Sequence, residues 1–502
     1  MAEKAYLAVD MGASSGRHLV GLFDGQRLKL EEIYRFENGP VEVNGRLHWD
    51  LLGLWSHVRK GMSAAGARFG GEVSSVGVDT WGVDFGLLGR DDVLLGNPYN
   101  YRDSQTNGMM AKAFSIVSRE EIFQHTGLQF MQLNSLYQLL AMKMANSPLL
   151  EAAETLLMVP DLFHWLLTGV KCNELTEAST SQFFNPVAGR WSTELLAKFG
   201  LPTDILCRIE QPGTNLGSLR DNLAGESGLS AASVVLPGSH DTASAVMAVP
   251  AASRPGSRPD WCYISLGTWA LMGIESPRPV ISDQVLKLNF TNEGGVAGTT
   301  RLLKNITGMW LIQECRRVWN SAGQNGAGRN WDWEDLNKLS AAAKPLVSFI
   351  NPDSQDFLAP SDMPDAFRQF CKRTGQTVPA DEGAVLRCAL DSLAMKFRQV
   401  LGMCEELAGG RIETIHIVGG GTKNRQLCQA AADACGRRVV AGPVEATAIG
   451  NVMMQAVAAG DVASVAEARE VIRRSFGVEE YEPHDTAAWD DAHEKFLAIA
   501  ER

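Results

Sequence analysis

The sequence predicts an α/β protein built from two similar domains, and three observations carry this prediction. The chain has 502 residues, which is too long for one ordinary hydrophobic core, so two cores are expected. A strand–turn–strand unit near the N-terminus recurs close to the middle of the chain. Short apolar strands alternate with longer helical stretches in both halves, which is typical of α/β domains.

The repeated unit is a predicted β-hairpin with a turn of small residues. In the first copy, the apolar run Tyr6–Val9 enters a turn at Gly12–Gly16, and the run His18–Phe23 leaves it. In the second copy, Trp261–Glu275 has the same order around Gly267, about half the chain further on. Two such hairpins at this spacing indicate a duplicated domain.

Helix-like stretches precede further short strands in each half. In the first half, Leu51–Phe69 precedes the strand Val76–Asp79. In the second half, Gly383–Leu407 precedes the strand Thr414–Val418, which a further helix-like run follows at Arg425–Cys435. This alternation supports one α/β domain in each half.

A segment rich in proline, glycine and serine separates the two halves. Residues 249–260 contain three Pro, one Gly and two Ser and show no apolar periodicity, which predicts a linker or hinge, although an ordinary surface loop would read similarly. The expected division is therefore an N-terminal domain at 1–248 and a C-terminal domain at 261–502. The latter ends in a tail at 462–502 with helical periodicity.

Composition excludes several classes of protein. The formal net charge is −12 and no Lys/Arg-rich run occurs, which argues against a nucleic-acid-binding protein. No apolar stretch is long enough for a membrane span, and the N-terminus lacks a signal-peptide pattern, so a cytoplasmic protein is expected. The nine scattered cysteines are expected to be thiols, and whether Cys371 pairs with Cys388 stays open at this stage.

The first predicted turn is a candidate phosphate site. Gly12–Gly16 offers backbone N–H groups at a tight turn, Ser14 and Ser15 add hydroxyl donors, and Arg17 follows at once. Asp10 ends the preceding strand, where a carboxylate is able to bind Mg²⁺ directly or through water. A plain hairpin turn with an incidental aspartate is the alternative.

The familiar nucleotide-binding signatures are absent from the sequence. Neither a G-x-x-x-x-G-K-[ST] loop nor a G-x-G-x-x-G turn after a strand occurs. Gly419–Gly421 instead lies between a predicted strand and a predicted helix, where a backbone without side chains allows close approach of a ring or a phosphate. A glycine-rich turn with no ligand is the alternative.

A candidate general base lies just before the linker. Ser239–Thr242 follows a predicted strand and opens a helix of small residues, and the dipole at that helix start favours ionised Asp241 over its acid form. Ionised Asp241 is able to accept a proton from an alcohol. The alternative is that Asp241 or Ser239 only caps the helix.

Aromatic and polar residues mix in two segments that suit sugar recognition. Asp79–Phe85 contains Trp81, which is able to stack on a sugar ring, and Gly82, which leaves room for one. Tyr101–Asp103 is a second candidate, and core packing is the alternative for both aromatic residues. In 305–315, a predicted helix, Trp310 is expected to face the core, with Asn305 and Gln313 as polar exceptions.

These segments resemble the FGGY carbohydrate kinases, which belong to a larger group of two-domain ATPases that includes hexokinase and actin. The motifs span the chain nearly end to end and keep the order of that family. They are AVDMGASSGR (Ala8–Arg17), DTWGVDF (Asp79–Phe85), YRDSQTNG (Tyr101–Gly108), SHDTASAV (Ser239–Val246), SLGTWALMG (Ser265–Gly273), TNEGG (Thr291–Gly295), LKNITGMWL (Leu303–Leu311), HIVGGG (His416–Gly421) and AGPVEATAIGN (Ala441–Asn451).

The resemblance implies a fold and a set of site residues. The fold would be two similar actin/hexokinase-like, or ribonuclease H-like, domains with a cleft between them. Asp241 would be the catalytic base and Asp10 the carboxylate on the Mg²⁺ side. Positions implied to contact the sugar are Gly82, His240, Asp241, Thr242 and Asn305. Positions implied to contact ATP are Ala13, Ser14, Ser15, Gly16, Arg17, Thr268, Gln313 and Gly420.

The resemblance also implies a reaction, the transfer of the γ-phosphoryl group of ATP to a small ketose. The motifs are most similar to those of family members that phosphorylate L-rhamnulose at its 1-hydroxyl group, in L-rhamnose degradation. One departure is Gln105, where an arginine is expected. A kinase of another ketose, such as L-fuculose or L-xylulose, and a non-catalytic sugar sensor are the alternatives. A monomer or a small homo-oligomer is expected.

Overall fold

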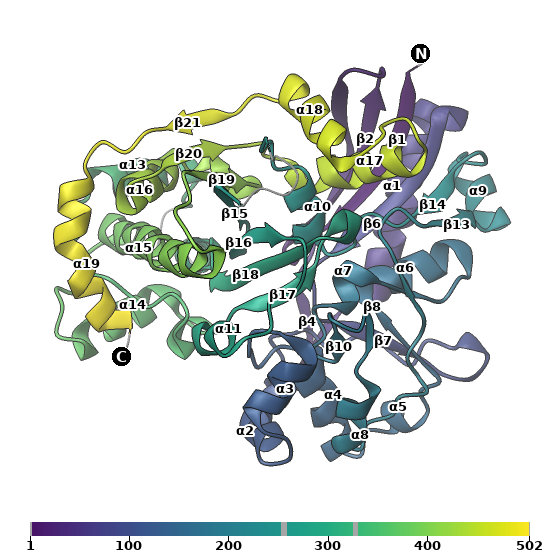
Figure 1. Ribbon diagram of the computed structural model, residues 1–502, viewed down its shortest axis with the longest axis horizontal. Coiled ribbons are helices and arrows are strands. Elements are labelled where there is room, and N and C mark those ends of the chain that lie inside the picture. Colours follow the sequence, from purple (N-terminus) through teal and green to yellow (C-terminus); the bar gives the residue numbers. More distant parts are fainter. Residues whose placement is uncertain (1–2, 253–258, 325–329, 501–502) are drawn as a thin grey trace. The chain divides into compact units, whose positions relative to one another are not determined.

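The computed structural model describes residues 3–252, 259–324 and 330–500 (Figure 1). The chain divides into two compact units that interleave in sequence. The first unit contains residues 1–254, 275–303 and 445–477, and the second contains 255–274, 304–444 and 478–502. Residues 253–258 of the predicted linker lie outside the described residues.

A six-stranded sheet forms the centre of the first unit. Its order is β13 (Asn215–Ser218), β14 (Ser233–Val235), β6 (Val73–Thr80), β1 (Lys4–Met11), β2 (Ser15–Phe23) and β3 (Leu28–Glu37). β1 pairs antiparallel with β2, which confirms the predicted N-terminal hairpin, and β1, β6 and β14 are parallel. β1 is buried from its second residue on, as expected for a strand covered on both faces.

The second sheet repeats this arrangement. Its order is β17 (Thr291–Gly294), β18 (Thr300–Thr307), β16 (Trp269–Ser276), β15 (Trp261–Leu266), β19 (Thr414–Val418), β20 (Arg438–Ala441) and β21 (Glu479–Tyr481). β15 and β16 form the second predicted hairpin, β19 and β20 continue in parallel, and β21 ends the sheet antiparallel, as β13 does in the first. The common topology confirms the predicted duplication. The unit boundary passes through β16 and β18, and β17 belongs to the first unit.

Two helices cover opposite faces of the first sheet. A Cβ added to Gly61 of α1 (Leu51–Phe69) would meet the ring of His18, whereas one added to Gly21 would meet Val452 of α17 (Ala446–Ala458). His18 and Gly21 are three residues apart in β2, so they point to opposite faces. The first sheet is therefore a buried layer between helices.

Further elements complete the first unit. The other helices are α2 (Met109–Phe114), α3 (Arg119–Thr126), α4 (Ser135–Met144), α5 (Pro148–Glu151), α6 (Val159–Thr168), α7 (Leu175–Ala178), α8 (Thr193–Lys198), α9 (Asp221–Ser227), α10 (Asp241–Met247), α11 (Asp283–Leu288) and α18 (Val465–Ser475). Two-stranded pairs are β4 (Pro40–Val43) with β5 (Arg46–Trp49), β7 (Phe85–Leu88) with β8 (Thr155–Met158), β9 (Asn173–Glu174) with β12 (Ile209–Glu210), and β10 (Phe184–Asn185) with β11 (Arg190–Trp191).

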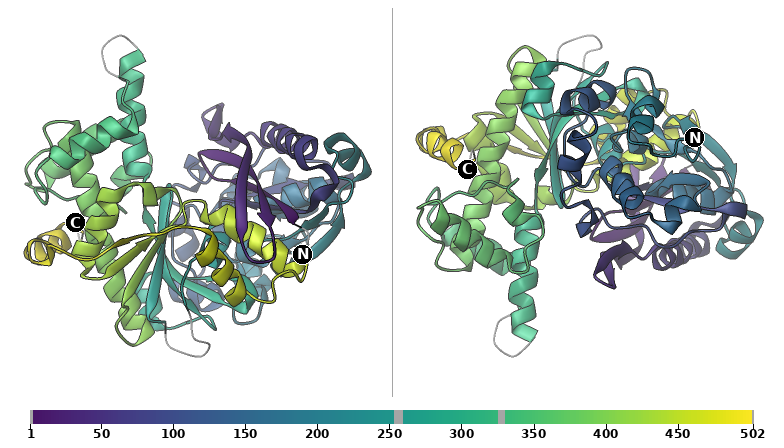
Figure 2. Two further views of the ribbon diagram at one scale, coloured as in Figure 1. Left: turned by 90° about the horizontal axis from the view of Figure 1, so that it is seen from above. Right: turned by 90° about the horizontal axis from the view of Figure 1, so that it is seen from below.

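Helices of the second unit pack on its own sheet and on one another. They are α12 (Trp310–Gln324), α13 (Trp333–Ala342), α14 (Met363–Arg373), α15 (Glu382–Ala408), α16 (Arg425–Cys435) and α19 (Thr486–Ala500). α19, yellow in Figure 2, contacts the green helices α15 and α16. The C-terminal tail is thus shared, because α18 belongs to the first unit and α19 to the second.

The expectation of one helix over 305–315 was wrong. Asn305 lies in strand β18, and α12 begins only at Trp310. Gly308 separates the two elements, since a Cβ there would lie 2.6 Å from the Trp269 backbone, and no side chain fits. The indole of Trp310 is half-buried and donates to the carbonyl oxygen of Phe357 at 3.1 Å.

Two questions raised by composition also have structural answers. All nine cysteines are free thiols, and the buried side chains of Cys371 and Cys388 hydrogen-bond to each other. Among the described residues, no helix combines the length and the apolar character that crossing a membrane requires.

Helices α10 and α17 lie side by side in the first unit at unusually close range (Figure 1). A Cβ on Gly450 of α17 would lie 1.8 Å from the carbonyl oxygen of Ser244 in α10. We therefore expect Gly450→Ala to lower the free energy of unfolding by about 1–3 kcal/mol, measured by urea denaturation. Gly225→Ala is the matched control. It lies in exposed α9 with open space around its Cα, and should raise stability by up to about 1 kcal/mol. Equal stability of the Gly450→Ala variant and wild type would contradict this packing.

Candidate functional site

Three aspartates meet at one edge of the first sheet because three parallel segments end there. Asp10 near the end of β1 is directly paired with Asp79 near the end of β6. The segment after β14 continues alongside β6, since the Thr80 N–H donates to the carbonyl oxygen of Ser239 at 2.9 Å. Asp241 follows as the first residue of α10. Ligand sites of open α/β sheets lie at this carboxyl edge.

The two strand-end aspartates are buried in a crowded field of negative charge. Burial raises the pKa of Asp10, the charges of Asp241 and Glu445 raise it further, and Arg17 opposes them. Burial and the charge of Asp10 raise the pKa of Asp79 well above its usual value. Ionisation of both carboxyl groups is therefore less favourable than that of an exposed aspartate.

Hydrogen bonds compensate this charge only in part. The Arg17 guanidinium donates to Asp10 Oδ2 at 2.8 Å and forms a second ion pair with Glu445. Asn451 of α17 donates to Asp79 Oδ2 at 2.6 Å. The other oxygen of Asp79, Oδ1, is buried without a hydrogen-bond partner. The edge thus retains acceptor capacity for a cation or a donor.

Hydrogen bonds within the turn and from Asn38 stabilise the turn between β1 and β2. The Gly12 N–H donates to the Ser15 carbonyl at 2.9 Å, and the Asn38 side chain donates to the Gly12 carbonyl at 2.8 Å. Gly16 is required by packing, because a Cβ there would lie 2.1 Å from the Phe36 ring. Ala13, Ser14, Ser15 and Arg17 remain partly or fully exposed. The predicted phosphate turn is therefore preformed.

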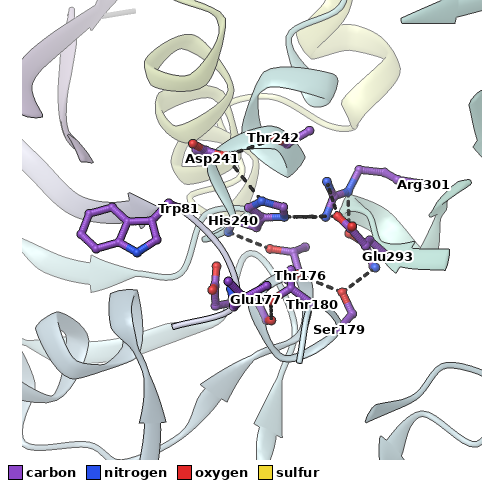
Figure 3. Close-up of polar contacts among 12 residues, drawn as sticks. Trp81, Thr176, Glu177, Ser179, Thr180, His240, Asp241, Thr242, Glu293 and Arg301 are labelled. Atoms are coloured by element: carbon purple, nitrogen blue, oxygen red, sulfur yellow. Dashed lines mark hydrogen bonds and ion pairs between the residues drawn. The ribbon is translucent and has the colours of Figure 1, made fainter. Parts of the chain in front are cut away.

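The predicted base and its neighbours come together at the start of α10 (Figure 3). The Asp241 side chain is 33% exposed, and its Oδ1 accepts a hydrogen bond from the Thr242 hydroxyl at 3.1 Å. The Nε2 atom of the largely buried His240 lies 3.5 Å from the same oxygen. A Cβ on Gly82 would lie 3.2 Å from His240 Nε2, so Gly82 also borders this group.

Trp81 takes the core role that the sequence left as an alternative to sugar stacking. Its ring packs on Trp49 with centroids 4.0 Å apart, and its Nε1 donates to Asp84 Oδ2 at 3.0 Å. Figure 3 shows the indole turned away from His240. Tyr101 is also buried beside Trp49. Both aromatic residues support the buried carboxyl of Asp84, whose pKa burial raises to about 7.

A buried glutamate supports the loop that carries the base. Glu174 Oε2 accepts from the backbone N–H of Ser239 at 3.2 Å and from the hydroxyl of Thr176 at 2.5 Å. The Thr176 hydroxyl oxygen in turn accepts from the backbone N–H of His240 at 3.1 Å. Burial raises the pKa of Glu174 to about 8 and that of nearby Glu177 well above its usual value.

In the second unit, the structure gathers predicted ATP-side residues around the end of β15. The backbone N–H of Trp310, at the start of α12, donates to the Thr268 carbonyl at 3.1 Å, so Thr268 lies beside the helix that carries Gln313. Gly421 fits because a Cβ there would lie 2.2 Å from Leu266, whereas Gly420 faces open space. Asn305 lies half-buried on β18.

Sequence reasoning missed several charged residues of the first unit. Asp79 gave a usable signal, since it ends a strand in the same way as Asp10. Glu293 lies inside a quoted motif, but its role depends on Arg301, which pairs with it across β17 and β18. No sequence pattern marks Glu174, because its role is to accept a hydrogen bond from Ser239, which lies more than 60 residues later in the chain.

Comparison with known protein families gives two matches that together span most of the chain. Residues 5–248 match the N-terminal domain of the FGGY family of carbohydrate kinases. Residues 262–459 match the C-terminal domain of the same family. These matches confirm the resemblance expected from the motifs.

Two similar proteins named rhamnulokinase match this chain over nearly its whole length. A rhamnulokinase of Bacteroides thetaiotaomicron is 44% identical over 491 residues, which cover 98% of each chain. A rhamnulokinase of Oceanobacillus iheyensis is 38% identical over 479 residues, covering 95% of this chain and 98% of the other.

Solved structures of sugar kinases share the fold. A ligand-bound xylulose kinase from Lactobacillus acidophilus superposes with a TM-score of 0.81 at 14% identity, covering 99% of this chain and 98% of the other. A gluconate kinase from the same organism gives 0.79 at 15% identity, covering 100% and 98%. These likenesses confirm the predicted two-domain α/β fold.

The buried carboxyl of Glu174 predicts a specific pH dependence of stability. Folded Glu174 holds its proton up to about pH 8, whereas in the unfolded chain it ionises near 4.5. Between these values the folded state binds more protons, so the free energy of unfolding falls as pH rises. We expect Glu174→Gln to make this fall shallower in urea denaturation between about pH 5 and about pH 8. Exposed Glu120→Gln is the control and should keep the wild-type slope. An unchanged slope in Glu174→Gln would contradict the assignment.

Proposed function

The chain belongs to the FGGY family of carbohydrate kinases, and we propose that it transfers the γ-phosphoryl group of ATP to the 1-hydroxyl group of L-rhamnulose. The observation that carries the proposal is Asp241, a partly exposed carboxylate at a helix start beside two buried aspartates. The choice of L-rhamnulose is supported by relatives named rhamnulokinase at 36–44% identity over nearly the whole chain. The proposal includes a monomer or small homo-oligomer working in the cytoplasm.

Asp241 acts as the base in the proposed reaction. Its carboxyl group lies at the start of α10, is partly exposed, and accepts a hydrogen bond from the Thr242 hydroxyl at 3.1 Å. Phosphoryl transfer passes through a loose transition state, so orientation of the attacking hydroxyl matters more than early deprotonation. Asp241 therefore orients the 1-hydroxyl group and takes its proton late in the transfer.

The turn at 13–17 and three residues of the second unit provide the proposed nucleotide contacts. Backbone N–H groups of Ala13–Gly16 and the hydroxyls of Ser14 and Ser15 are donors for phosphate oxygens. Arg17 adds a charged donor, partly neutralised by Asp10. In the second unit the proposed ATP-contacting residues are Thr268, Gln313 and Gly420, of which Gly420 leaves open space for a ring.

Asp10 and Asp79 fit a proposed Mg²⁺ site. Among the described residues, no group of three or more His, Cys, Asp or Glu side chains is arranged to hold a metal alone. Mg²⁺ commonly uses one or two carboxylates and completes its shell with water and phosphate oxygens. The raised pKa of both aspartates and the unpartnered Asp79 Oδ1 match such a partial site. When bound, Mg²⁺ neutralises charge on the phosphate oxygens.

The proposed sugar contacts are Gly82, His240, Thr242 and Asn305, together with the base. Gly82 presents backbone without a side chain next to His240 and Thr180, where a Cβ would lie only 3.2 Å and 3.1 Å from their side chains. His240 and Thr242 offer polar groups adjacent to Asp241. Kinases of other ketoses share this chemistry, so L-fuculose and L-xylulose are the nearest alternative substrates, and a non-catalytic sugar sensor is the alternative from another class.

A coupled ADP-release assay across a ketose panel tests the function. With ATP and Mg²⁺, we expect kcat/KM for L-rhamnulose to exceed that for L-fuculose and L-xylulose by about tenfold or more, and chelation of Mg²⁺ to abolish turnover. Preference for another ketose would reassign the substrate. Sugar binding without ADP release from any ketose would favour the sensor.

Replacement of the base separates chemistry from binding. We expect Asp241→Asn to lower kcat by about 10²–10⁴-fold while ATP still binds, because only proton acceptance and orientation are lost. Asp221→Asn is the matched control, since Asp221 is likewise the first residue of a short helix in the same unit but is exposed on α9. Near-normal turnover of Asp241→Asn would remove Asp241 from the mechanism.

A further inference from the structure

We propose that Arg301 and Glu293 are positioning residues that fix the tautomer of His240, so that its Nε2–H faces Asp241. The inference rests on the proposed function, because it takes Asp241 to be the base. It assigns a role to two residues that the motifs do not identify as part of the site. It is supported by a series of contacts that runs from β17 and β18 through His240 to Asp241 (Figure 3).

The hairpin β17–β18 presents a fully buried ion pair to His240. Glu293 and Arg301 are direct partners across the two strands, and Arg301 Nη1 lies 3.2 Å from Glu293 Oε2. Arg301 Nε donates to the Gly294 carbonyl at 2.8 Å. The side chain of Arg301 is 0% exposed and that of Glu293 is 5% exposed. The guanidinium is thus held by a hydrogen bond at Nε and faces the Glu293 carboxylate with Nη1.

The remaining edge of the guanidinium determines where the imidazole proton lies. Arg301 Nη2 is 3.1 Å from His240 Nδ1. A guanidinium has donors only, so Nδ1 must accept this hydrogen bond and carries no proton. The neutral imidazole then has its proton on Nε2. That atom lies 3.5 Å from Asp241 Oδ1, a separation that a small rotation of the partly exposed carboxylate shortens to a hydrogen bond.

Glu293 makes Arg301 necessary for this choice of tautomer. Glu293 Oε2 lies 3.4 Å from His240 Nδ1, close enough for the carboxylate to attract a proton to that nitrogen. Arg301 counters the charge of Glu293 and occupies the lone pair of Nδ1 instead. Without the guanidinium, the favoured arrangement is Nδ1–H donating to Glu293, with a bare Nε2 towards Asp241.

Backbone hydrogen bonds connect both His240 and the β17–β18 hairpin to the segment around α7. The His240 N–H donates to the Thr176 hydroxyl at 3.1 Å. The Gly294 N–H donates to the Ser179 hydroxyl at 2.7 Å, and Ser179 in turn donates to the Thr176 carbonyl at 2.9 Å. The backbones of His240 and of Gly294, whose carbonyl accepts from Arg301, are therefore both anchored to the segment around α7.

The consequence concerns the orientation of the base. An Nε2–H donor next to Oδ1 holds that oxygen and leaves Oδ2 of Asp241 for the sugar hydroxyl. A bare Nε2 would instead put a lone pair against the carboxylate, and the repulsion would turn Asp241 away from its working position. Loss of the tautomer should therefore affect turnover and leave ATP binding nearly unchanged.

The test uses ¹⁵N NMR of histidine-labelled full-length protein, because protonated and bare imidazole nitrogens resonate at different frequencies. The His240 signals are assigned by their absence in His240→Asn. Two variants remove the guanidinium, Arg301→Met and the double variant Arg301→Met/Glu293→Gln. The double variant removes both charges, which avoids leaving Glu293 buried and unpaired if the single variant folds poorly.

A matched control removes an equivalent pair elsewhere in the unit. Arg469 Nη2 lies 2.8 Å from Glu275 Oε2, and Arg469 is similarly buried at 7% side-chain exposure. Arg469→Met/Glu275→Gln therefore reports the effect of losing a buried arginine–glutamate pair without contact to His240.

We expect wild-type His240 and the control to show a pure Nε2–H tautomer. The Arg301 variants should show Nδ1–H or a mixture, with kcat for L-rhamnulose about 10- to 100-fold lower and the KM for ATP within about twofold. An Nδ1–H tautomer in wild type, or an unchanged Nε2–H tautomer and kcat in both Arg301 variants, would overturn the inference. The NMR measurement needs no substrate, so a wild-type chain that phosphorylates no ketose but shows pure Nε2–H contradicts the proposed function alone.

Discussion

Like charges held together at the end of parallel strands are the constraint around which the first unit is organised. β1, β6 and the segment after β14 finish at one edge, which forces Asp10, Asp79 and Asp241 into one electrostatic neighbourhood. Neighbouring side chains reduce the repulsion among these carboxyl groups. Arg17 and Asn451 partly offset the two buried aspartates, and only Asp241, at the start of a helix, retains access to solvent.

Glu174 supports the loop that carries Asp241, and a second acid, Glu177, lies nearby. Burial raises the pKa of Glu174 to about 8 and that of Glu177 well above its usual value, so both carboxyls are harder to ionise than exposed ones. Burial thus limits the negative charge that these two acids add near a site that is proposed to bind the phosphates of ATP.

Local patterns in the sequence were sufficient for the strands, helices and turns that make up each sheet. The two hairpins, α1 and β19 lie where periodicity and small-residue turns predict them, because such signals depend on neighbouring residues. The helix expected over 305–315 failed because tight packing of Gly308 against Trp269 ends a strand there, which is a tertiary effect. Trp81 was ambiguous for the same reason, since only the fold brings Trp49 beneath it. The Arg301–Glu293–His240 chain depends on strand register, which no local pattern specifies.

The repeated topology offers an internal comparison for the acidic edge. β15 and β19 occupy in the second sheet the places of β1 and β6 in the first, and there the paired residues corresponding to Asp10 and Asp79 near the strand ends are Ser265 and Val418. The architecture is therefore satisfied by a hydroxyl and an aliphatic side chain at these two positions. Carboxylates at the same places in the first copy go beyond what the shared topology requires, and the charge of Asp10 raises the pKa of Asp79. Their mutual repulsion lowers thermodynamic robustness, which is the pattern expected where chemistry and durability compete for the same residues.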